Sequence, residues 1–428
     1  MIGQLGLTAP ALAAPQAETA QRAEFYAAET ALRSYVERAL ERYPGIREVE
    51  ARHRAALERI EQATAYPDPM VGFMQAVRSP ETRVGPQINA VTLSQTFPWF
   101  GKRDLRGEVA AGDAETVREA IAIRQRDVIA AVKRAFYDLA YVDAALRITE
   151  EEQLLLEQYE QLAATRYAAG QGSQQAVVKL QAEVTKIMTR RQELGRLRLT
   201  FAARLNSLMD DPPENPIASI PSLAVPTVQL DRVRLAELGR DHRPELRVLE
   251  AAQRRTESSI DLARKNVRPD FTLSAGFANV LARRDPAGRA SPPPDNGKNP
   301  ITVSFGFNLP IRRAKYDAAV RQALETLTAE HEQYLAAHND MTRAIEEHLA
   351  RINTLSEQIR LFERALVPQA EEALRSVESA YTTGQAGVLD LLDGERVLLE
   401  VRLMIARYRS DYLVSLAELE RAIGVRFP

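Results

Sequence analysis

Two aspartates near the C-terminal end of the chain are the residues whose spacing most directly suggests chemistry. Asp390 and Asp393 lie three residues apart in a leucine-rich run that follows a turn at Gly384. Residues with this spacing share one face of a helix, so the two carboxylates point the same way. Such a pair can attract cations, or it can cap the start of a helix or face solvent. The residues alone leave these interpretations open.

No other set of residues has the spacing of a catalytic or metal site. The five histidines are scattered, and HEQYLAAH, His331 to His338, differs from the HExxH of zinc enzymes. No phosphate-binding loop or nucleophile elbow occurs. The chain has no cysteine, which excludes disulfides, thiolate metal sites and a catalytic thiol. We therefore expect no enzyme activity, no metal site and no cofactor.

The composition narrows the class of protein further. The chain has 428 residues, and its 56 basic residues nearly balance 58 acidic ones, which argues against a nucleic-acid partner. No run approaches about 18 consecutive apolar residues, so no transmembrane helix is expected. Residues 1–29 contain a small-x-small pattern at Ala11–Ala13 without a basic region before it. They are interpreted either as the remnant of a signal peptide or as a disordered N-terminus.

Landmarks of the sequence recur in the same order. The motif Tyr-x-x-Gly-Gln occurs at Tyr167 and again at Tyr381, 214 residues later. This order predicts a tandem duplication, with copies at residues 30–209 and 229–428 and a proline-rich linker at 210–228. Three proline landmarks repeat at offsets of 200, 202 and 212 residues: Pro44 with Pro244, Pro67 with Pro269, and Pro98 with Pro310.

Each copy predicts a helix, two short strands, a very long helix, a turn and a returning helix. The strands of the second copy alternate strictly between large apolar and small polar residues, which is the period of a strand. The expected first helices are Leu32–Ala63 and Leu230–Asn266, and the expected strands are Met70–Val77, Gln87–Phe97, Phe271–Leu281 and Ile301–Leu309.

The long helices set the scale of the protein. The first runs from Lys102 to about Ala164, which corresponds to about 90 Å of helix. Its counterpart, from about Lys315 to Ala380, contains Pro368 and should be kinked or interrupted there. The first helix carries the apolar seam of a coiled coil: Val128, Val132, Ala135, Leu139, Val142 and Leu146.

Two classes of protein fit this plan. Strands of about ten residues with one apolar face suit the wall of an outer-membrane barrel. A barrel must close, because an open edge in lipid leaves backbone groups unsatisfied. Four strands are too few to close around a pore, so several chains would share one barrel. The alternative is a half-buried sheet in a soluble periplasmic coiled-coil adaptor or scaffold protein, which would need no detergent for extraction.

The duplicated plan, FPWFGKR at Phe97–Arg103 and YTTGQAGVLDLLDGE resemble the TolC-like outer-membrane efflux proteins, especially members that serve heavy-metal or other cation exporters. The resemblance implies a mostly helical α+β membrane protein and a homotrimer. Its chains would share a twelve-stranded outer-membrane β-barrel, and their coiled-coil helices would form a periplasmic α-barrel. It implies a passive exit duct for small molecules or metal cations, which docks onto a periplasmic adaptor (membrane fusion) protein and an inner-membrane pump of the RND type.

The same resemblance assigns a selectivity gate. Asp390 and Asp393 match aspartates at the periplasmic mouth, where three chains would bring six carboxylates together and favour cations. Tyr381 matches a tyrosine that helps to tie the closed tip to neighbouring helices. Family members often carry a basic and an acidic residue at the positions of Ala386 and Ala176. That ion pair is absent here, so closure has to rest on other contacts.

Two further groups of residues are assigned roles. In the first group, small side chains in the two hairpin turns would let an adaptor approach the backbone closely. In the second, aromatic residues suit the membrane interface, and the basic residues after them suit the aqueous layer. The docking tips are Gly170, Gln171, Gly172, Ser173, Gly384, Gln385, Ala386 and Gly387; the interface residues are Trp99, Phe100, Lys102 and Arg103.

Overall fold

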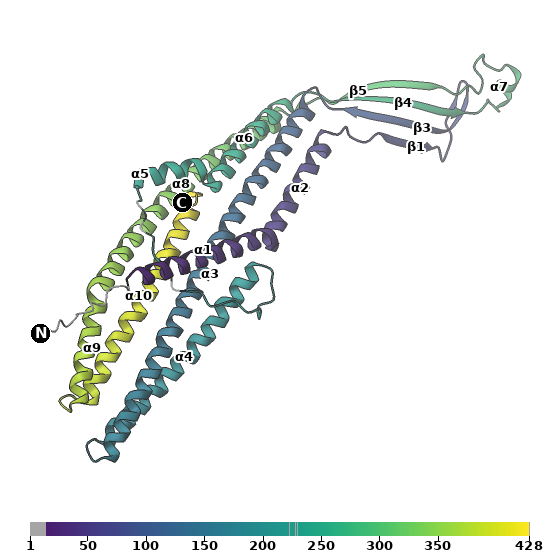
Figure 1. The fold of residues 1–428 in the computed structure, drawn as a ribbon. Coiled ribbons are helices and arrows are strands. Elements are labelled where there is room, and N and C mark those ends of the chain that lie inside the picture. Colours follow the sequence, from purple (N-terminus) through teal and green to yellow (C-terminus); the bar gives the residue numbers. More distant parts are fainter. Residues whose placement is uncertain (1–13, 222, 227, 229, 428) are drawn as a thin grey trace, which may run out of the picture. The chain divides into compact units, whose positions relative to one another are not determined.

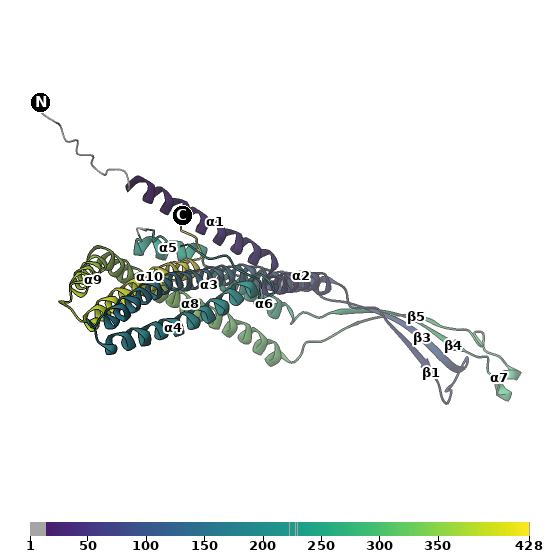
Figure 2. The same cartoon turned by 60° about the horizontal axis from the view of Figure 1, so that its bottom comes forward.

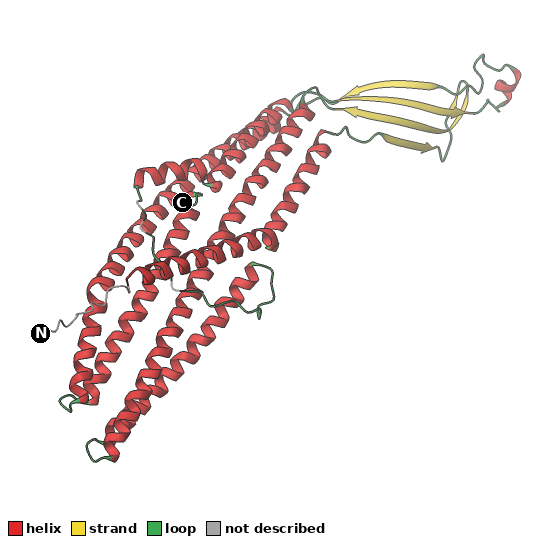
Figure 3. Cartoon of the chain, viewed as in Figure 1, coloured by secondary structure: helices red, strands yellow, loops and turns green. Residues whose placement is uncertain are grey.

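The computed structural model describes residues 14–221, 223–226, 228 and 230–427, which are mostly helical (Figure 3). The chain forms two compact units, each built from segments of both predicted copies. The long helices α3 (Lys102–Ala168) and α8 (Arg313–Leu361) contribute to both units. Unit 1 consists of Met1–Val49, Ile121–Pro244 and Ala337–Pro428, and unit 2 consists of Glu50–Ala120 and Glu245–Ala336.

Unit 2 contains an antiparallel sheet with strand order β1-β3-β4-β5 (Figure 1). The strand predictions of both copies are confirmed. The β3–β4 pairing, with Phe97 opposite Phe271, joins the two strand pairs into one sheet. The bounds are β1 (Met70–Gln75), β3 (Gly85–Phe97), β4 (Phe271–Val280) and β5 (Ile301–Phe307); the short β2 (Glu81–Thr82) pairs with β3, and α7 (Pro286–Ala290) lies between β4 and β5.

The sheet leaves large apolar side chains uncovered within one chain. Phe73 on β1 is 69% exposed, and Val303 and Phe305 on β5 are 75% and 64% exposed. β1 and β5 each pair with a neighbouring strand on one side only. Exposed apolar surface of this extent marks a face that meets another chain or an apolar medium.

The predicted first helix of each copy is in fact two helices. Leu32–Ala63 is divided into α1 (Ala14–Arg42) and α2 (Pro44–Thr64), and Leu230–Asn266 is divided into α5 (Arg232–His242) and α6 (Pro244–Lys265). Both breaks fall at a proline, which lacks the N–H of a helix interior and disfavours helical geometry in the residue before it. Helix α1 begins within predicted segment 1–29, whose residues 1–13 lie outside the described residues.

Unit 1 contains two helical hairpins. The first pairs α3 with α4 (Gln174–Leu208), and the second pairs α9 (Val367–Thr382) with α10 (Val388–Ile423). Their turns lie at the same end of unit 1 in both views (Figures 1 and 2). The expected interruption at Pro368 is confirmed as a π-helical turn, η1 (Phe362–Leu366), between α8 and α9. The proline ring would clash with a carbonyl four residues back, and widening the turn avoids that clash.

The core of unit 1 follows the predicted seam of α3. Val132, Ala135, Leu139 and Val142 are all fully buried. The N-terminal part of the seam packs against α1 and α4, and Val142 packs against leucines of α4 and α10. None of the described helices combines the length and apolarity that a membrane crossing requires.

Candidate functional site: the hairpin tips

The two hairpin turns have the same backbone structure. Gly170 and Gly384 adopt φ values of 74° and 77°, in the left-handed region that glycine enters without strain. In each turn, the glycine N–H donates to the carbonyl of the tyrosine three residues before it, at 3.0 and 3.1 Å. The following glutamine N–H donates to a carbonyl five residues back, at 2.9 and 2.8 Å. The repeated motif therefore encodes one turn geometry twice.

The helices that leave the turns are capped differently. Ser173 is the N-cap of α4, and its hydroxyl accepts the N–H of Ala176 at 3.3 Å. Gly387 is the N-cap of α10, and its own N–H donates to Oδ2 of Asp390 at 2.9 Å. A carboxylate in the first turn of a helix is favourable, because the free N–H groups there carry partial positive charge. Asp390 therefore has a structural role within one chain.

Asp393 lies one turn further along α10 and faces solvent. Its side chain is 81% exposed, and Arg396 approaches it to 3.7 Å. An exposed pair at this distance contributes little to stability. Within one chain, Asp390 therefore caps the helix and Asp393 is exposed. A ring of carboxylates at the mouth stays a prediction, because it requires more than one chain.

The two tips are joined by an arginine that the sequence analysis did not single out. Arg166, near the end of α3, donates through Nη1 to the carbonyl of Tyr381 at 2.7 Å and through Nη2 to that of Thr382 at 2.6 Å. Its guanidinium also lies over the ring of Tyr381, 4.9 Å from the centroid. These carbonyls belong to the last turn of α9, where a cation is favourable. We name this contact the Arg166 clasp.

Tyr381 is only 6% exposed, so its ring is held between the hairpins rather than left at the surface. Arg166 is a residue through which Tyr381 contacts the other hairpin. The role of Tyr381 in a gate stays a prediction. A difference between the two copies could have identified Arg166 from the sequence. Arg166 precedes the first tyrosine of the repeat, whereas Ala380 precedes the second.

The predicted docking tips are accessible within one chain. All eight residues are exposed except Ala386, which is half-buried. A side chain built on Gly170 or Gly384 would meet no atom within 4 Å. The turns therefore present open backbone, as close approach by a partner would require, and docking itself stays a prediction.

The aromatic residues assigned to the membrane interface begin the link from β3 to α3. Trp99 is half-buried, and its ring lies 5.3 Å from that of Phe271. Phe100 is 79% exposed and contacts Trp99 edge-on, at 6.1 Å between ring centroids. These positions are compatible with an interfacial role, which stays a prediction.

The aqueous placement of Lys102 is wrong. Its side chain is buried, and Nζ donates to Oδ1 of Asp270 at 2.8 Å and to the carbonyl of Arg268 at 2.7 Å. Lys102 therefore links the start of α3 to the residues before β4. Arg103 is half-buried; its guanidinium lies 3.6 Å from the ring centroid of Tyr66. A buried cation needs a nearby acceptor, which Asp270 supplies to Lys102 and the carbonyl of Thr64 supplies to Arg103, at 3.0 Å. Both basic residues thereby link the start of α3 to the segments that lead into the strands.

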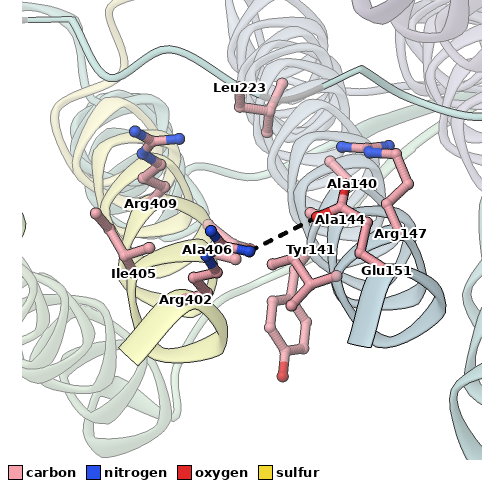
Figure 4. A pocket seen from close by; sticks show the side chains of 12 residues that line it. Ala140, Tyr141, Ala144, Arg147, Glu151, Leu223, Arg402, Ile405, Ala406 and Arg409 are labelled. Carbon is pink, nitrogen blue, oxygen red and sulfur yellow. Dashed lines mark ion pairs between the residues drawn. The ribbon is translucent and has the colours of Figure 1, made fainter. Parts of the chain in front are cut away.

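Further along the hairpins, α3 and α10 enclose a pocket of about 280 Å³ (Figure 4). Its arginines are already engaged. Arg402 lies 3.7 Å from Glu151 across the pocket, Arg147 donates to the carbonyl of Ile220 at 3.2 Å, and Arg409 pairs with Glu363 at 2.7 Å. The Arg402–Glu151 pair therefore links α10 to α3 across the pocket. The arginines that line the pocket leave no uncompensated charge for a ligand. The described residues contain no group of three side chains able to hold a metal ion.

A sheet of paired strands in one unit and long helical hairpins with matching turns in the other define a protein class. The sequence pattern of the family described as "Outer membrane efflux protein" matches residues 35–210 and 235–425. The chain belongs to this family, and it is an outer-membrane protein with a large periplasmic portion. Solved structures with the same fold include proteins described as outer membrane channels.

Individual relatives are distant in sequence. Outer membrane protein TolC of Escherichia coli is 26% identical over 180 residues, covering 39% of this chain and 36% of TolC, about a third of that relative's length. Cobalt-zinc-cadmium resistance protein CzcC of Cupriavidus metallidurans is 22% identical over 380 residues, covering 82% of this chain and 83% of CzcC. The structure of outer membrane protein VceC from Vibrio cholerae has a TM-score of 0.74 at 18% identity, covering 93% and 97% of the two chains.

Proposed function

We propose that three copies of this chain form an outer-membrane exit duct that passively releases small molecules or metal cations to the exterior. The edge strands of the sheet carry this proposal. β1 and β5 are each paired on one side only, and both bear exposed apolar residues. In lipid, unpaired strand edges leave backbone groups unsatisfied, so other chains have to pair them. Three chains would supply twelve strands, as the family resemblance implies.

The helical part of the duct would be a periplasmic α-barrel built from the duplicated hairpins. Three observations support the duplication: two separate matches to the family pattern, the same turn geometry at both tips, and helix breaks at Pro44 and Pro244. Coiled-coil packing of hairpins from three chains would cover the exposed helix faces.

Partners and cargo follow from the relatives. The accessible turns support docking by a periplasmic adaptor protein, which would connect the duct to an inner-membrane pump of the RND type. The matched relative named for cobalt, zinc and cadmium resistance supports metal cations as one class of cargo. Passive transport is consistent with a family of channels and requires no cofactor in this chain.

The gate is tested by removing charge without removing the helix cap. Asn can accept the N–H of Gly387 as Asp390 does. We expect purified wild-type protein in a planar bilayer to give discrete, cation-selective openings. In the double variant Asp390→Asn, Asp393→Asn, openings should persist, with cation selectivity reduced at least about twofold because the ring loses its charge. Glu400→Asn, an exposed acid further along α10, is the control.

The outcomes separate the parts of the proposal. Channels whose selectivity is unaffected by the double variant would retain the duct and reject the carboxylate gate. Folded protein that gives no channels and stays in solution without detergent would instead support a periplasmic scaffold. Measuring the mass of the detergent-solubilised assembly tests the trimer independently.

A further inference from the structure

A pair of carboxyl groups is buried between the two hairpins of unit 1. Glu395 on α10 is 1% exposed, and among the described residues neither of its carboxyl oxygens has a hydrogen-bond partner of ordinary geometry. Glu152 on α3 is 9% exposed, and its carboxyl faces that of Glu395. The pair lines a pocket of about 220 Å³ that Leu156, Leu392 and Leu399 also line. Two ionised carboxylates that face each other in such surroundings would be costly.

The nearest polar groups do not neutralise this pair. Tyr159 on α3 faces Glu395, but its hydroxyl donates to Glu378 on α9. Arg402 on α10, whose charge acts on both carboxyls, is engaged by acids on α3 and α9, at 3.7 and 3.2 Å. A hydroxyl has a single hydrogen, so Tyr159 cannot also supply one to Glu395.

The outer part of the pocket carries charges that compensate one another. On α4, Lys186 pairs with Glu183 at 2.7 Å, and Arg396 of α10 lies 3.7 Å from the same glutamate. The other charged residues that line the pocket are Arg190 on α4 and Glu400 on α10, and both are exposed. Water screens charges at the surface, so this outer set does not replace a partner for the buried pair.

We infer that Glu152 and Glu395 share one proton, and that this proton-binding site links the contact between α3 and α10 to the pH of the surrounding compartment. One proton allows one carboxyl to donate to the other, which gives both groups a partner and leaves one negative charge in place of two. The two residues belong to different hairpins. Loss of the proton therefore places two like charges across the contact between them.

The direction of the pH effect follows from the two groups. Burial, and after it the charge of Glu395, raises the pKa of Glu152 to about 8. Burial also raises the pKa of Glu395. A carboxyl whose pKa is higher in the folded state binds more protons there. Its stabilisation is fully present below the unfolded pKa of about 4.5 and is lost as pH rises to about 8. The contact should be tightest in acid and should loosen progressively between about pH 4.5 and 8.

Infrared spectroscopy of the full-length protein in detergent tests the shared proton directly. We expect an absorption band from a protonated buried carboxyl at about pH 6 that disappears by about pH 9. In Glu395→Gln the band should titrate at lower pH, because Glu152 loses the charge of its neighbour, and the double variant Glu152→Gln, Glu395→Gln should remove it. Glu400→Gln is the matched control, because Glu400 lines the same pocket but is exposed. A band that does not titrate, or that survives both substitutions, would overturn the inference.

Hydrogen exchange tests the link to the hairpin contact. Once corrected for intrinsic exchange rates, protection of the α3 and α10 segments around the pair should fall at least about tenfold between about pH 6 and 9 in the wild type. The fall should be clearly smaller in Glu395→Gln, whose amide keeps the volume without the charge, because only one carboxyl remains to ionise. If that variant does not fold, Glu152→Gln removes the same proton from the other hairpin. Parallel losses of protection in wild type and folded variant would contradict the link. Neither measurement requires channel activity, so this inference and the proposed duct can fail separately.

Discussion

Removing the Arg166 clasp should separate the hairpin tips within each chain. Arg166→Ala deletes two hydrogen bonds from a half-buried guanidinium and one contact with an aromatic ring. At about 1 kcal/mol for each hydrogen bond and about 0.5 kcal/mol for the ring contact, the loss is about 2.5 kcal/mol. This corresponds to a shift of roughly 70-fold in the equilibrium between joined and separated tips. Arg166→Lys keeps the charge but loses the fork, so it should have an intermediate effect.

The chain has no cysteine, so paired spin labels can be introduced without side reactions. Gln171→Cys and Gln385→Cys place labels on the two exposed turns, and diluting labelled copies among unlabelled ones isolates distances within one chain. Pulsed electron paramagnetic resonance should give one narrow distance distribution with Arg166 present. In Arg166→Ala, the distribution should become broader and longer.

Arg375→Ala is the matched control, because Arg375 lies on α9 and, among the described residues, its ion pair is with Glu372 on its own helix, at 2.8 Å. This variant should leave the distance distribution unchanged. Equal distributions in the wild type and Arg166→Ala would refute the clasp. Equal broadening in Arg166→Ala and Arg375→Ala would show that general loss of charge, and not the specific contact, separates the tips.

Two further predictions concern stability. Gly384→Ala should lower the free energy of unfolding by about 1 kcal/mol, because an L side chain is strained at positive φ. Gly387→Ala, at φ −88°, should cost less, and equal shifts in thermal unfolding would contradict this reasoning. Lys133→Met should destabilise unit 1 by about 3–5 kcal/mol, because it leaves Glu420 buried without its ion-pair partner. Adding Glu420→Met should recover most of that loss, and a double variant as unstable as the single one would show that the ion pair is not the cause.

Patterns within short segments were sufficient to predict much of the architecture. Period-two alternation, strict in the second copy, located the strands. The coiled-coil seam located the buried face of α3, and Tyr-x-x-Gly-Gln located both turns. These features depend on neighbouring residues, because side-chain direction in strands and helices repeats over a few positions. The division of the first helices was missed, although Pro44 and Pro244 had been identified as landmarks. The apolar pattern continues across each proline, although the proline interrupts the helical hydrogen bonding and begins a second helix.

The tertiary structure decided which charged residues are buried and what they contact. Arg166 and Tyr381 are separated by 215 residues, and no local pattern brings Glu152 opposite Glu395 or Lys102 onto Asp270. Lys102 follows an aromatic segment, which in sequence is typical of an interfacial cation, yet the packing of α3 against the β4 connection encloses it. The sequence determined the elements because propensity and periodicity are local. Their ionic contacts were decided by packing, because burial and electrostatic pairing depend on which distant segments meet.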